Sequence, residues 1–380
     1  MDESLHVELV TETYPPDING VALTVQSLEQ GLRSLGHRVA LVRPEHSEDS
    51  SRAHPDLMLV EGAPIPRYPG LRFGLPAGRR LHARWASQRP DAIYVATEGP
   101  LGWSALRAAR RLGIPVATGF HTRFDDYMGR YGAGFLTPWV FAWLRRFHNR
   151  ADTTLVPTLE LQSSLTEQGF RQVRRLGRSV DTKQFHPGWR DNALRAQWGL
   201  NDDDIAVISV GRLAAEKNLN VALAAFRALQ ARKPSTRMIF VGDGPIRSEL
   251  QSANPDVIFC GVQLGDELAR HYASADLFLF PSLSETFGNV TLEAMASGLA
   301  TVAFDYGATR EHLRSHEHGV AVPFGDEAGF INAVVDIGTQ GSLFKLGEAA
   351  RAAVQVLHPD DVARDFARLL ADLAKFRQAA

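Results

Sequence analysis

Two cationic side chains follow an apolar run in the second half of the chain. The segment "DIAVISVGRLAAEKN" contains the run from Ile205 to Val210, and Arg212 and Lys217 come after it. Parallel sheets bind ligands at the carboxyl ends of their strands. A guanidinium and an ammonium placed there can stabilise a phosphate leaving group as negative charge develops on it. The alternative is two solvated surface cations, which are common.

Two carboxylates follow a second apolar run, "DLFLFP". Glu285 lies in the polar loop after this run, and Glu293 lies in the early turns of a helix that we expect to begin at Asn289 or Val290. The free N–H groups of such a helix start attract anions. The two carboxylates can accept hydrogen bonds from the hydroxyls of a ribose and a hexose. An ordinary solvated acid and an acid that interacts with the helix dipole are the alternative.

The first half of the chain has a comparable edge. The segment "LHVELVTETYPPDINGVALTV" predicts a buried strand, a loop and a helix. Gly20 lies just ahead of that helix, where it could let a phosphate approach free backbone N–H groups. His121 follows the strand in "PVATGFHT", and either a catalytic or positioning role or that of a satisfied polar residue is consistent with its place. Taken alone, the Gly20 loop could equally be a simple connection.

Length and composition bound the class of protein. The 380 residues favour two domains, and the single cysteine, Cys260, excludes a disulfide framework and a cysteine-based zinc site. The acidic N-terminus and the lack of an apolar stretch of about 20 residues predict neither a signal peptide nor a membrane span. We therefore expect a cytoplasmic protein that contacts a membrane at most peripherally.

Alternating strands and helices predict an α/β protein built from two doubly wound halves. We place the first domain at residues 1–182, the second at 183–360, and the hinge near residues 178–190, where Pro187 and Gly188 lie in a polar stretch. Residues 361–380 predict an amphipathic helix that packs back toward the first domain.

Arginine is concentrated in one window of the first half. Residues 65–150 contain 14 arginines and four acidic residues, although the whole chain has a net charge of −2. The interleaving of arginine with Trp, Phe and Leu suits an anionic membrane interface. Ordinary helices with arginine on the solvated side are the alternative, and nothing in the sequence favours nucleic acid.

Taken together, these motifs resemble those of the retaining glycosyltransferases of family four. The similarity rests on the Gly20 loop, "FHT", "VGRLAAEKN", "VGDGP" and the E-x7-E stretch from Glu285 to Glu293, and it extends over nearly the whole chain. The segments "TETYPPDINGVA", "YPGLRFGLP", "TEGPLGWSAL" and "FHTRFDDY" look closest to bacterial GDP-mannose-dependent α-mannosyltransferases. The resemblance implies the GT-B fold, in which two Rossmann-like domains face a central cleft.

The resemblance also implies a role for individual residues. The catalytic set would be His121 beside the sugar, Arg212 and Lys217 on the departing nucleotide, and Glu285 on the donor sugar. The substrate-binding set would comprise residues for the diphosphate, sugar, ribose and base: Gly20, Thr286, Phe287, Gly288, Asn289, Val290, Glu293, Gly261 and Val262. A donor phosphate oxygen would accept the acceptor's proton, so no dedicated carboxylate base is needed. We expect no metal site.

We therefore expect a retaining hexosyltransferase that needs no cofactor. GDP-mannose is favoured over a UDP-sugar as donor, and the acceptor is expected to be a lipid or a glycan. A UDP-sugar-dependent glycolipid glycosyltransferase and a catalytically silent nucleotide-sugar-binding subunit are the alternatives. A dinucleotide dehydrogenase is disfavoured, because no G-x-G-x-x-G follows the first strand.

Overall fold

The computed structural model describes residues 4–17, 19–46, 49, 55–64, 72–121 and 137–378. The chain divides into two compact units, which are described separately. Unit 1 contains residues Met1–Gly177 and Pro359–Ala380, and unit 2 contains Arg178–His358. The domain limits expected from the sequence, 1–182, 183–360 and 361–380, stay predictions.

Unit 1 is built on a parallel sheet. In its described residues seven strands lie in the order β3-β2-β1-β6-β7-β8-β9, and every neighbouring pair is parallel. A short antiparallel hairpin pairs β4 with β5. The strand order reverses between β1 and β6, which is the point where open α/β sheets bind ligands.

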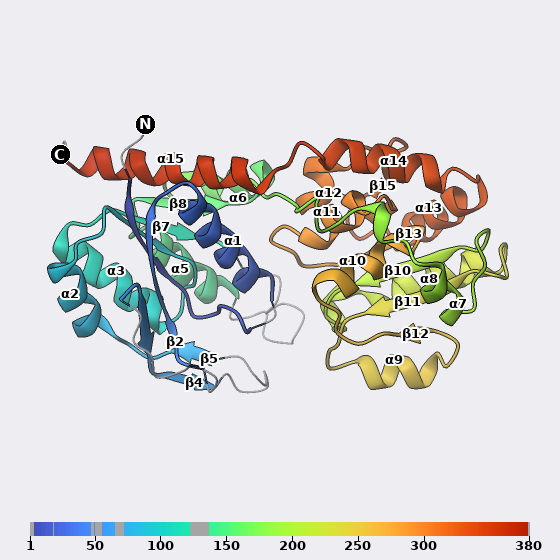
Figure 1. Cartoon of the computed structure of the whole chain (residues 1–380), viewed down its shortest axis with the longest axis horizontal. Helices are drawn as coiled ribbons and strands as arrows, with labels where there is room; N and C mark the ends of the chain where they lie inside the picture. Colours follow the sequence, from blue (N-terminus) through green and yellow to red (C-terminus); the bar gives the residue numbers. More distant parts are fainter. Residues whose placement is uncertain are drawn as a thin grey trace. The chain divides into compact units, whose positions relative to one another are not determined.

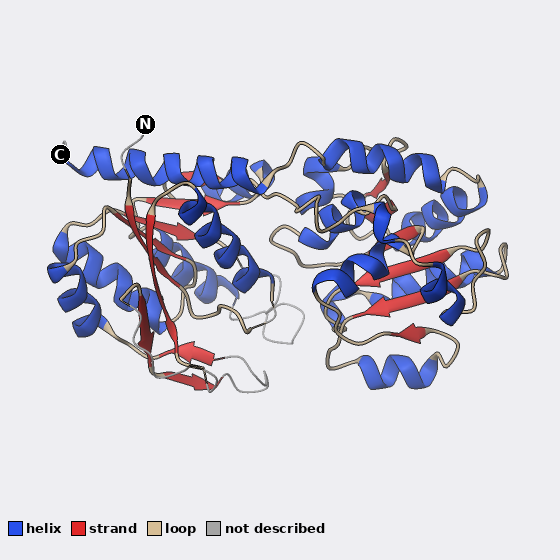
Figure 2. Cartoon of the chain, viewed as in Figure 1, coloured by secondary structure: helices blue, strands red, loops and turns tan. Residues whose placement is uncertain are grey.

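Strands and helices of unit 1 alternate along the chain, except that β2 to β5 follow one another with no helix among the described residues between them (Figures 1 and 2). Its strands are β1 (His6–Val10), β2 (Arg38–Pro44), β3 (Leu57–Val60), β4 (Gly62–Pro64), β5 (Arg72–Gly74), β6 (Ala92–Val95), β7 (Val116–Gly119), β8 (Thr153–Val156) and β9 (Val173–Arg175). Its helices are α1 (Gly20–Ser34), α2 (Gly78–Ser87), α3 (Pro100–Leu112), α5 (Thr137–His148), α6 (Leu159–Glu167) and α15 (Pro359–Gln378).

Helices cover both faces of this sheet. On one face, α1 and α15 bury apolar side chains such as Leu28 and Phe366 against Leu9 and Tyr94. On the other face, α2, α3 and α5 pack into a second core that includes Trp85. The helix α15, red in Figure 1, lies along α1. The last helix of the chain therefore contributes to the same apolar core as the first helix. Burial of this apolar stripe explains why the amphipathic pattern of α15 forms a helix.

Unit 2 repeats the architecture. Six strands lie in the order β12-β11-β10-β13-β14-β15 in the described residues, again all parallel. The order reverses between β10 and β13, so the loops after these two strands leave the sheet side by side. Both parallel sheets expected from the sequence are thus confirmed.

The elements of unit 2 follow the same alternation (Figure 2). Its strands are β10 (Ala206–Val210), β11 (Arg237–Val241), β12 (Ile258–Phe259), β13 (Leu277–Phe280), β14 (Ala300–Phe304) and β15 (Gly319–Val322). Its helices are α7 (Asn192–Gln197), α8 (Leu219–Gln230), α9 (Arg247–Ala253), α10 (Gly265–Ala273), α11 (Asn289–Ala296), α12 (Gly307–His312), α13 (Glu327–Thr339) and α14 (Leu343–Val354), with 3-10 turns η2 (Pro187–Trp189) and η3 (Ala215–Lys217).

Candidate active site

The loop after β10 holds the two predicted cations. Gly211 adopts a φ of 143°, a conformation that favours glycine, and the turn η3 brings Lys217 to the end of the loop. Arg212 lies with its Nη1 atom 3.6 Å from Oε1 of Glu216. Gly211, Arg212 and Lys217 line a small hollow together with Phe280 of β13. Both cations therefore sit at the carboxyl end of β10, as the sequence indicates.

The loop after β13 meets this first loop through an ion pair. Lys217 Nζ donates to Oε1 of Glu285, and the Ser282 hydroxyl donates to the same oxygen over 2.8 Å. The backbone N–H of Leu283 donates to the carbonyl of Glu216 over 2.8 Å. The Lys217 ammonium also lies 5.8 Å from the centre of the Phe280 ring. The fold thus couples a cation and a carboxylate that lie 68 positions apart.

The helix α11 begins directly after this loop, at Asn289, one of the two starts expected from the sequence. Gly288 at its N-cap has a φ of 90° and no side chain caps the first turn. The uncapped N–H groups of the first turn point toward the loop and, with the helix dipole, favour an anion there. A β-carbon at Gly288 would lie 3.2 Å from the Phe280 ring, so glycine also suits the packing.

The loop before α11 is held from the other side by α12. The Phe287 carbonyl accepts from Ala308 N–H over 2.7 Å, and the Tyr306 hydroxyl donates to the Ser282 carbonyl over 2.9 Å. Phe287 itself is buried in an apolar cluster. These contacts fix the backbone of Thr286, whose neighbours on both sides are anchored.

Glu293 lies one turn into α11. The hydroxyl of Tyr272 donates to its Oε2 atom over 3.0 Å. Burial raises the pKa of Glu293 to about 7, and the bond from Tyr272 opposes part of that rise. A carboxylate accepts hydrogen bonds from hydroxyls through both oxygens when it is ionised, and it is a poorer acceptor once it takes up a proton.

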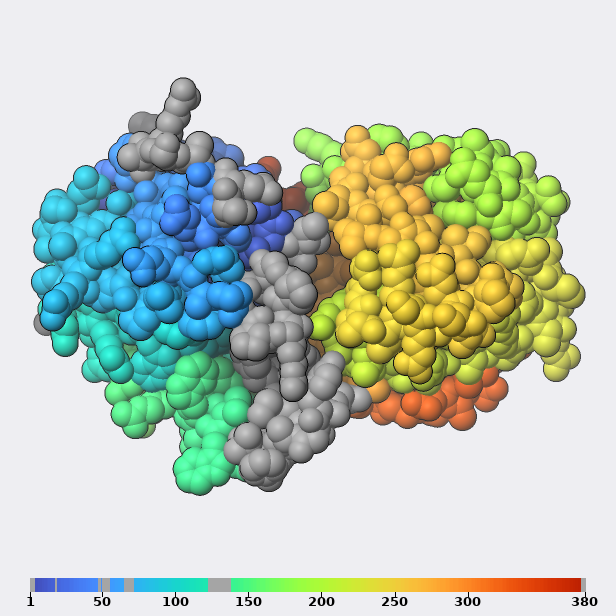
Figure 3. All heavy atoms as spheres, turned by 90° about the horizontal axis from the view of Figure 1, so that it is seen from below, coloured from blue at the N-terminus to red at the C-terminus, as the bar shows by residue number. Residues whose placement is uncertain are grey.

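The predicted base site follows β12. Gly261 has a φ of 69°, its carbonyl accepts from Gly242 N–H over 2.8 Å, and Val262 is 50% exposed. Burial raises the pKa of the neighbouring Cys260 thiol to about 11, so this cysteine is a neutral thiol near pH 7. The stretch from α9 to α10, yellow to orange in Figure 3, forms part of the surface of unit 2.

In unit 1, Gly20 is the first residue of α1 and a β-carbon there would meet open space. The side chain of Asn19, however, accepts from the N–H groups of Val21 and Ala22. The expectation that these N–H groups are free is therefore wrong, because Asn19 is a residue type favoured for capping and takes that role here. Gly20 can still allow close approach to its own backbone.

His121 follows β7 in the same unit. Its Nε2 atom lies 2.7 Å from the hydroxyl of Tyr94, a buried residue of β6. Tyr94 in turn packs edge to face against Phe366 of α15, with 5.1 Å between ring centres. A β-carbon at Gly119 would lie 2.1 Å from the Tyr94 hydroxyl, so this contact requires glycine. The next residues of the "FHT" motif, from Thr122 on, lie outside the described residues.

Comparisons with known proteins identify the family. The profile described as "Glycosyl transferases group 1" matches residues 204–340, and "Glycosyltransferase Family 4" matches residues 18–184. A "GDP-mannose-dependent alpha-mannosyltransferase" of Mycobacterium tuberculosis is 36% identical over 332 residues, which cover 85% of each protein. This chain belongs to glycosyltransferase family 4. The family predicted from the motifs is thereby confirmed.

Other proteins agree with this family 4 assignment. A mannosyltransferase of the same description from Mycolicibacterium smegmatis is 34% identical over 81% of each protein. Sucrose-phosphate synthase from Thermosynechococcus elongatus superposes with a TM-score of 0.78 at 20% identity, covering 97% of this chain and 99% of that one. Anabaena HepE, solved with UDP and glucose, superposes with a TM-score of 0.76 at 18% identity, covering 97% of this chain and 100% of that one. These solved structures show the GT-B fold, and the protein is a glycosyltransferase.

Several contacts of this family 4 enzyme were not expected from its sequence. Tyr272, Ser282 and Tyr94 each bond to a predicted site residue. Glu12 was not expected either. Its carboxylate accepts a hydrogen bond from the N–H of Leu101 over 2.8 Å, and burial raises the pKa of this carboxyl group to about 7. A tyrosine in an amphipathic segment such as "LARHYA" or in an apolar one such as "AIYV" gives only a weak signal, because its partner is distant in sequence.

Neither a membrane-spanning helix nor a metal-binding cluster occurs among the described residues. None of the helices in the described part of this glycosyltransferase is both long and apolar enough to cross a bilayer. No group of three or more His, Cys, Asp or Glu side chains within that part is arranged to hold a metal ion.

Proposed function

We propose that this glycosyltransferase moves mannose from GDP-mannose to an acceptor hydroxyl with retention of the anomeric configuration. The observation that carries the proposal is the ion pair between Lys217 and Glu285. It places a cation suited to a leaving diphosphate beside a carboxylate suited to a sugar, at one edge of the sheet. The mannosyltransferases of Mycobacterium tuberculosis and Corynebacterium glutamicum, the latter 34% identical over 78% of this chain, support GDP-mannose as the donor.

Each part of the donor has a group in unit 2 that suits it. Arg212 and Lys217 would neutralise the diphosphate, with N–H groups from Asn289 and Val290 at the start of α11. The ribose hydroxyls would donate to Glu293. The sugar would meet Glu285 and the backbone of residues 286–288, and the base would lie against Gly261 and Val262.

The proposed reaction breaks the bond between the anomeric carbon and the diphosphate oxygen. The acceptor oxygen forms its bond to the same face of that carbon, and the acceptor's proton passes to the departing phosphate oxygen. Arg212 and Lys217 contribute by stabilising the charge that grows on the diphosphate, an effect that strengthens toward the transition state. We assign His121 to the sugar and Gly20 to the diphosphate as the contributions of unit 1.

A thermal-shift comparison of GDP, UDP and ADP tests the donor. A ligand that binds the native state raises the melting temperature by an amount set by its affinity. We expect GDP to raise it more than UDP or ADP at equal concentration. An equal or larger shift with UDP would instead favour the second candidate, a UDP-sugar-dependent glycolipid glycosyltransferase. For that candidate the 27% identity to a Streptococcus pneumoniae "Alpha-monoglucosyldiacylglycerol synthase" supports the glycolipid product.

A product assay separates a working enzyme from a silent subunit. The protein, GDP-mannose and a membrane lipid extract should yield a mannosylated product and free GDP, and NMR of the product should show the α configuration of the donor. Binding of GDP with no turnover on lipid or glycan acceptors would favour the silent nucleotide-sugar-binding subunit.

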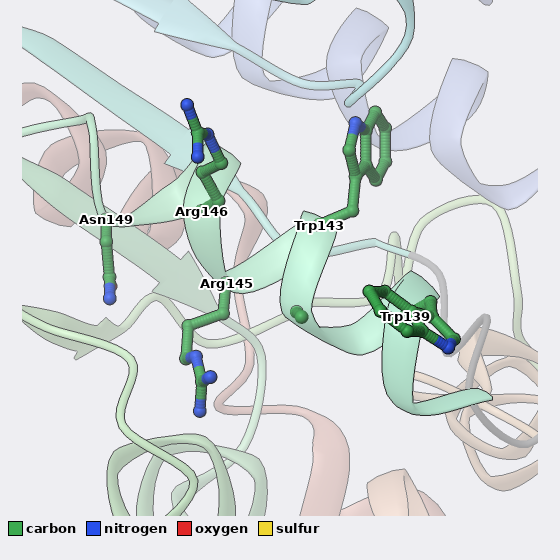
Figure 4. A pocket seen from close by; sticks show the side chains of 6 residues that line it. Trp139, Trp143, Arg145, Arg146 and Asn149 are labelled. Carbon is green, nitrogen blue, oxygen red and sulfur yellow. The ribbon is translucent and has the colours of Figure 1, made fainter. Parts of the chain in front are cut away.

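We extend the proposal to a lipid or glycan acceptor reached at the inner, anionic face of the plasma membrane. The helix α5 supplies the support, because Trp139 is 76% and Trp143 40% exposed. Figure 4 shows Trp143 and Arg146 projecting to one side of α5 and Arg145 to the other. These side chains line a shallow groove of ≈ 450 Å³. Trp and Arg together are typical of surfaces that enter the headgroup region.

The charge around this groove fits the same partner. The guanidinium of Arg150 lies 5.1 Å from the Trp103 ring centre, and that of Arg107 lies 5.9 Å from it. Partial burial lowers the pKa of Arg150, and repulsion from Arg146, Arg110 and Arg107 lowers it further. A cluster of like charges is relieved by phosphate groups, so an anionic headgroup suits it.

Sedimentation with vesicles tests the membrane contact. Vesicles that contain an anionic lipid should bind the protein, and binding should weaken as salt is raised. W143A and R146A should reduce binding, as should replacement of the exposed Arg79 and Arg80 on α2. R314A, which removes a charge that is 78% exposed in unit 2, is the matched control. Equal sedimentation of all these variants would overturn the membrane contact.

A further inference from the structure

The hydroxyl of Tyr272 is the side-chain group that holds Glu293. It donates to Oε2 of the carboxylate over 3.0 Å and lies 3.5 Å from the Val290 carbonyl oxygen. Tyr272 is completely buried at the end of α10, whereas the Glu293 side chain reaches the surface in part. One carboxylate oxygen is thus tied to the protein interior.

The ring of Tyr272 is itself fixed by aromatic packing. Phe185 contacts it edge to face with 5.8 Å between ring centres, and Phe278 of β13 does so at 6.0 Å. The surrounding core includes Ile208 and Ala294. Because a buried ring in such a cluster has little freedom, its hydroxyl points to a fixed place on α11.

We propose that Tyr272 is a positioning residue that holds Oε2 of Glu293 so that the carboxylate is ionised and oriented to bind the ribose of the donor. The inference rests on the proposed function, because it assigns Glu293 to the ribose. It predicts that donor affinity follows the charge of Glu293 and that Tyr272 sets the pH at which this charge is lost.

Two opposing effects set the pKa of the Glu293 carboxyl group. Burial favours the neutral acid and raises the pKa of Glu293 to about 7, while the bond from Tyr272 favours the ionised form. Removing the hydroxyl removes the opposing effect and must raise the pKa further. The ribose hydroxyls need an acceptor, so the protonated acid binds them less well.

Charged groups on the neighbouring elements are engaged elsewhere. On α10, Arg270 pairs with Asp191 and His271 bonds to the Glu267 carbonyl. On α14, Arg351 donates to the Ala296 carbonyl, and on α12 the His312 ring contacts Phe287. Glu285, which precedes α11, pairs with Lys217. Among the described residues, Tyr272 is therefore the titratable side chain that bonds to the Glu293 carboxylate.

The test compares the wild-type protein with Y272F. The affinities for GDP and for 2′,3′-dideoxy-GDP are measured by calorimetry from pH 6 to pH 9. The ratio of the two affinities isolates the ribose contact, because titration of the phosphates affects both ligands equally. In the wild type this ratio should fall as pH drops through about 7. In Y272F the fall should come at higher pH, so that at pH 7 the ratio is roughly three- to tenfold smaller, and it should recover near pH 9.

Two further variants separate positioning from packing. In E293Q the ratio of the affinities for GDP and 2′,3′-dideoxy-GDP should not change with pH. F185L alters the packing on the Tyr272 ring and keeps the tyrosine hydroxyl. It should therefore lower the melting temperature and leave unchanged the pH at which the affinity ratio falls. An unchanged midpoint in folded Y272F would overturn the proposal.

An infrared titration keeps the test independent of any ligand. The carboxylic-acid C=O band that is missing from E293Q should persist to higher pH in Y272F than in the wild type. If GDP does not bind at all, the proposed function fails while this titration still decides whether Tyr272 controls the protonation of Glu293.

Discussion

Lys217 and Glu285 form an ion pair between the loops that follow two adjacent strands, β10 and β13. The Lys217 side chain is 18% exposed and that of Glu285 16%, so both are shielded without being sealed from solvent. Ser282 donates to the same carboxylate oxygen that Lys217 contacts. The pair therefore links the two loops in the absence of a donor. A bound diphosphate could replace Glu285 as the partner of the Lys217 ammonium.

K217A should lower kcat far more than it changes the KM for the donor. The cation is proposed to act on charge that grows in the transition state, and losing one such interaction reduces kcat by roughly 10²–10³. Steady-state kinetics with varied GDP-mannose would measure both constants. R227A, which breaks an exposed pair with Asp256 in the same unit, should leave them unchanged. A rise in KM that accounts for the whole loss would contradict the assigned role.

Y94F should lower kcat by roughly fivefold while the protein stays folded, because the hydroxyl that orients His121 is lost and the ring remains. Rates at saturating donor and acceptor are the measurement. F366L keeps the hydroxyl and perturbs only the ring packing on Tyr94, so it serves as the control. A kcat for Y94F equal to that of the wild type would show that the bond has no part in the reaction.

E293Q should stabilise the protein at alkaline pH even as it weakens nucleotide binding. The pKa of Glu293 is about 7 in the fold against an ordinary value of 4.5, so the folded state holds the proton more tightly. The stability that this proton provides is fully present below pH 4.5 and is lost as pH rises through about 7. Glutamine carries no charge, so the free energy of unfolding of E293Q should exceed that of the wild type by about 3 kcal/mol at pH 8.5 and by less than about 1 kcal/mol at pH 5.

Denaturant unfolding of both proteins at the two pH values checks this expectation. E249Q, at an acid in the first turn of α9, is the control for removing a charge from a helix of unit 2. A difference between E293Q and the wild type that is the same at pH 5 and pH 8.5 would show that the carboxylate is not destabilised by burial.

F366A should destabilise unit 1 by about 3–5 kcal/mol, because it removes a fully buried ring from the core shared by α15, α1 and the sheet. Chemical denaturation monitored by circular dichroism would measure this change. F376A, at an exposed ring of the same helix, should change the free energy of unfolding by less than about 0.5 kcal/mol. Similar effects of the two substitutions would mean that the stability of unit 1 does not depend on the packing of α15 against α1 and the sheet.

The sequence by itself determined the class, the two parallel sheets and the family. Apolar runs such as "DLFLF" predict buried strands, and the loops after them carry Arg212, Lys217, Glu285 and Glu293 in an order that family 4 shares. These features are local or depend on spacing along the chain, so they can be predicted without knowing which strands pair. The start of α11 at Asn289 was predictable for the same reason.

Only the tertiary structure decided which side chains meet. The order of the strands places the loops after β10 and β13 side by side, and this alone brings Lys217 to Glu285. The tyrosines that bond to Glu293 and His121 are buried, and they reach partners that are distant in sequence. The capping of α1 by Asn19 likewise depends on the conformation that its loop adopts. Such contacts join residues distant in sequence, and burial then sets the pKa of Glu293, so spacing alone could not specify them.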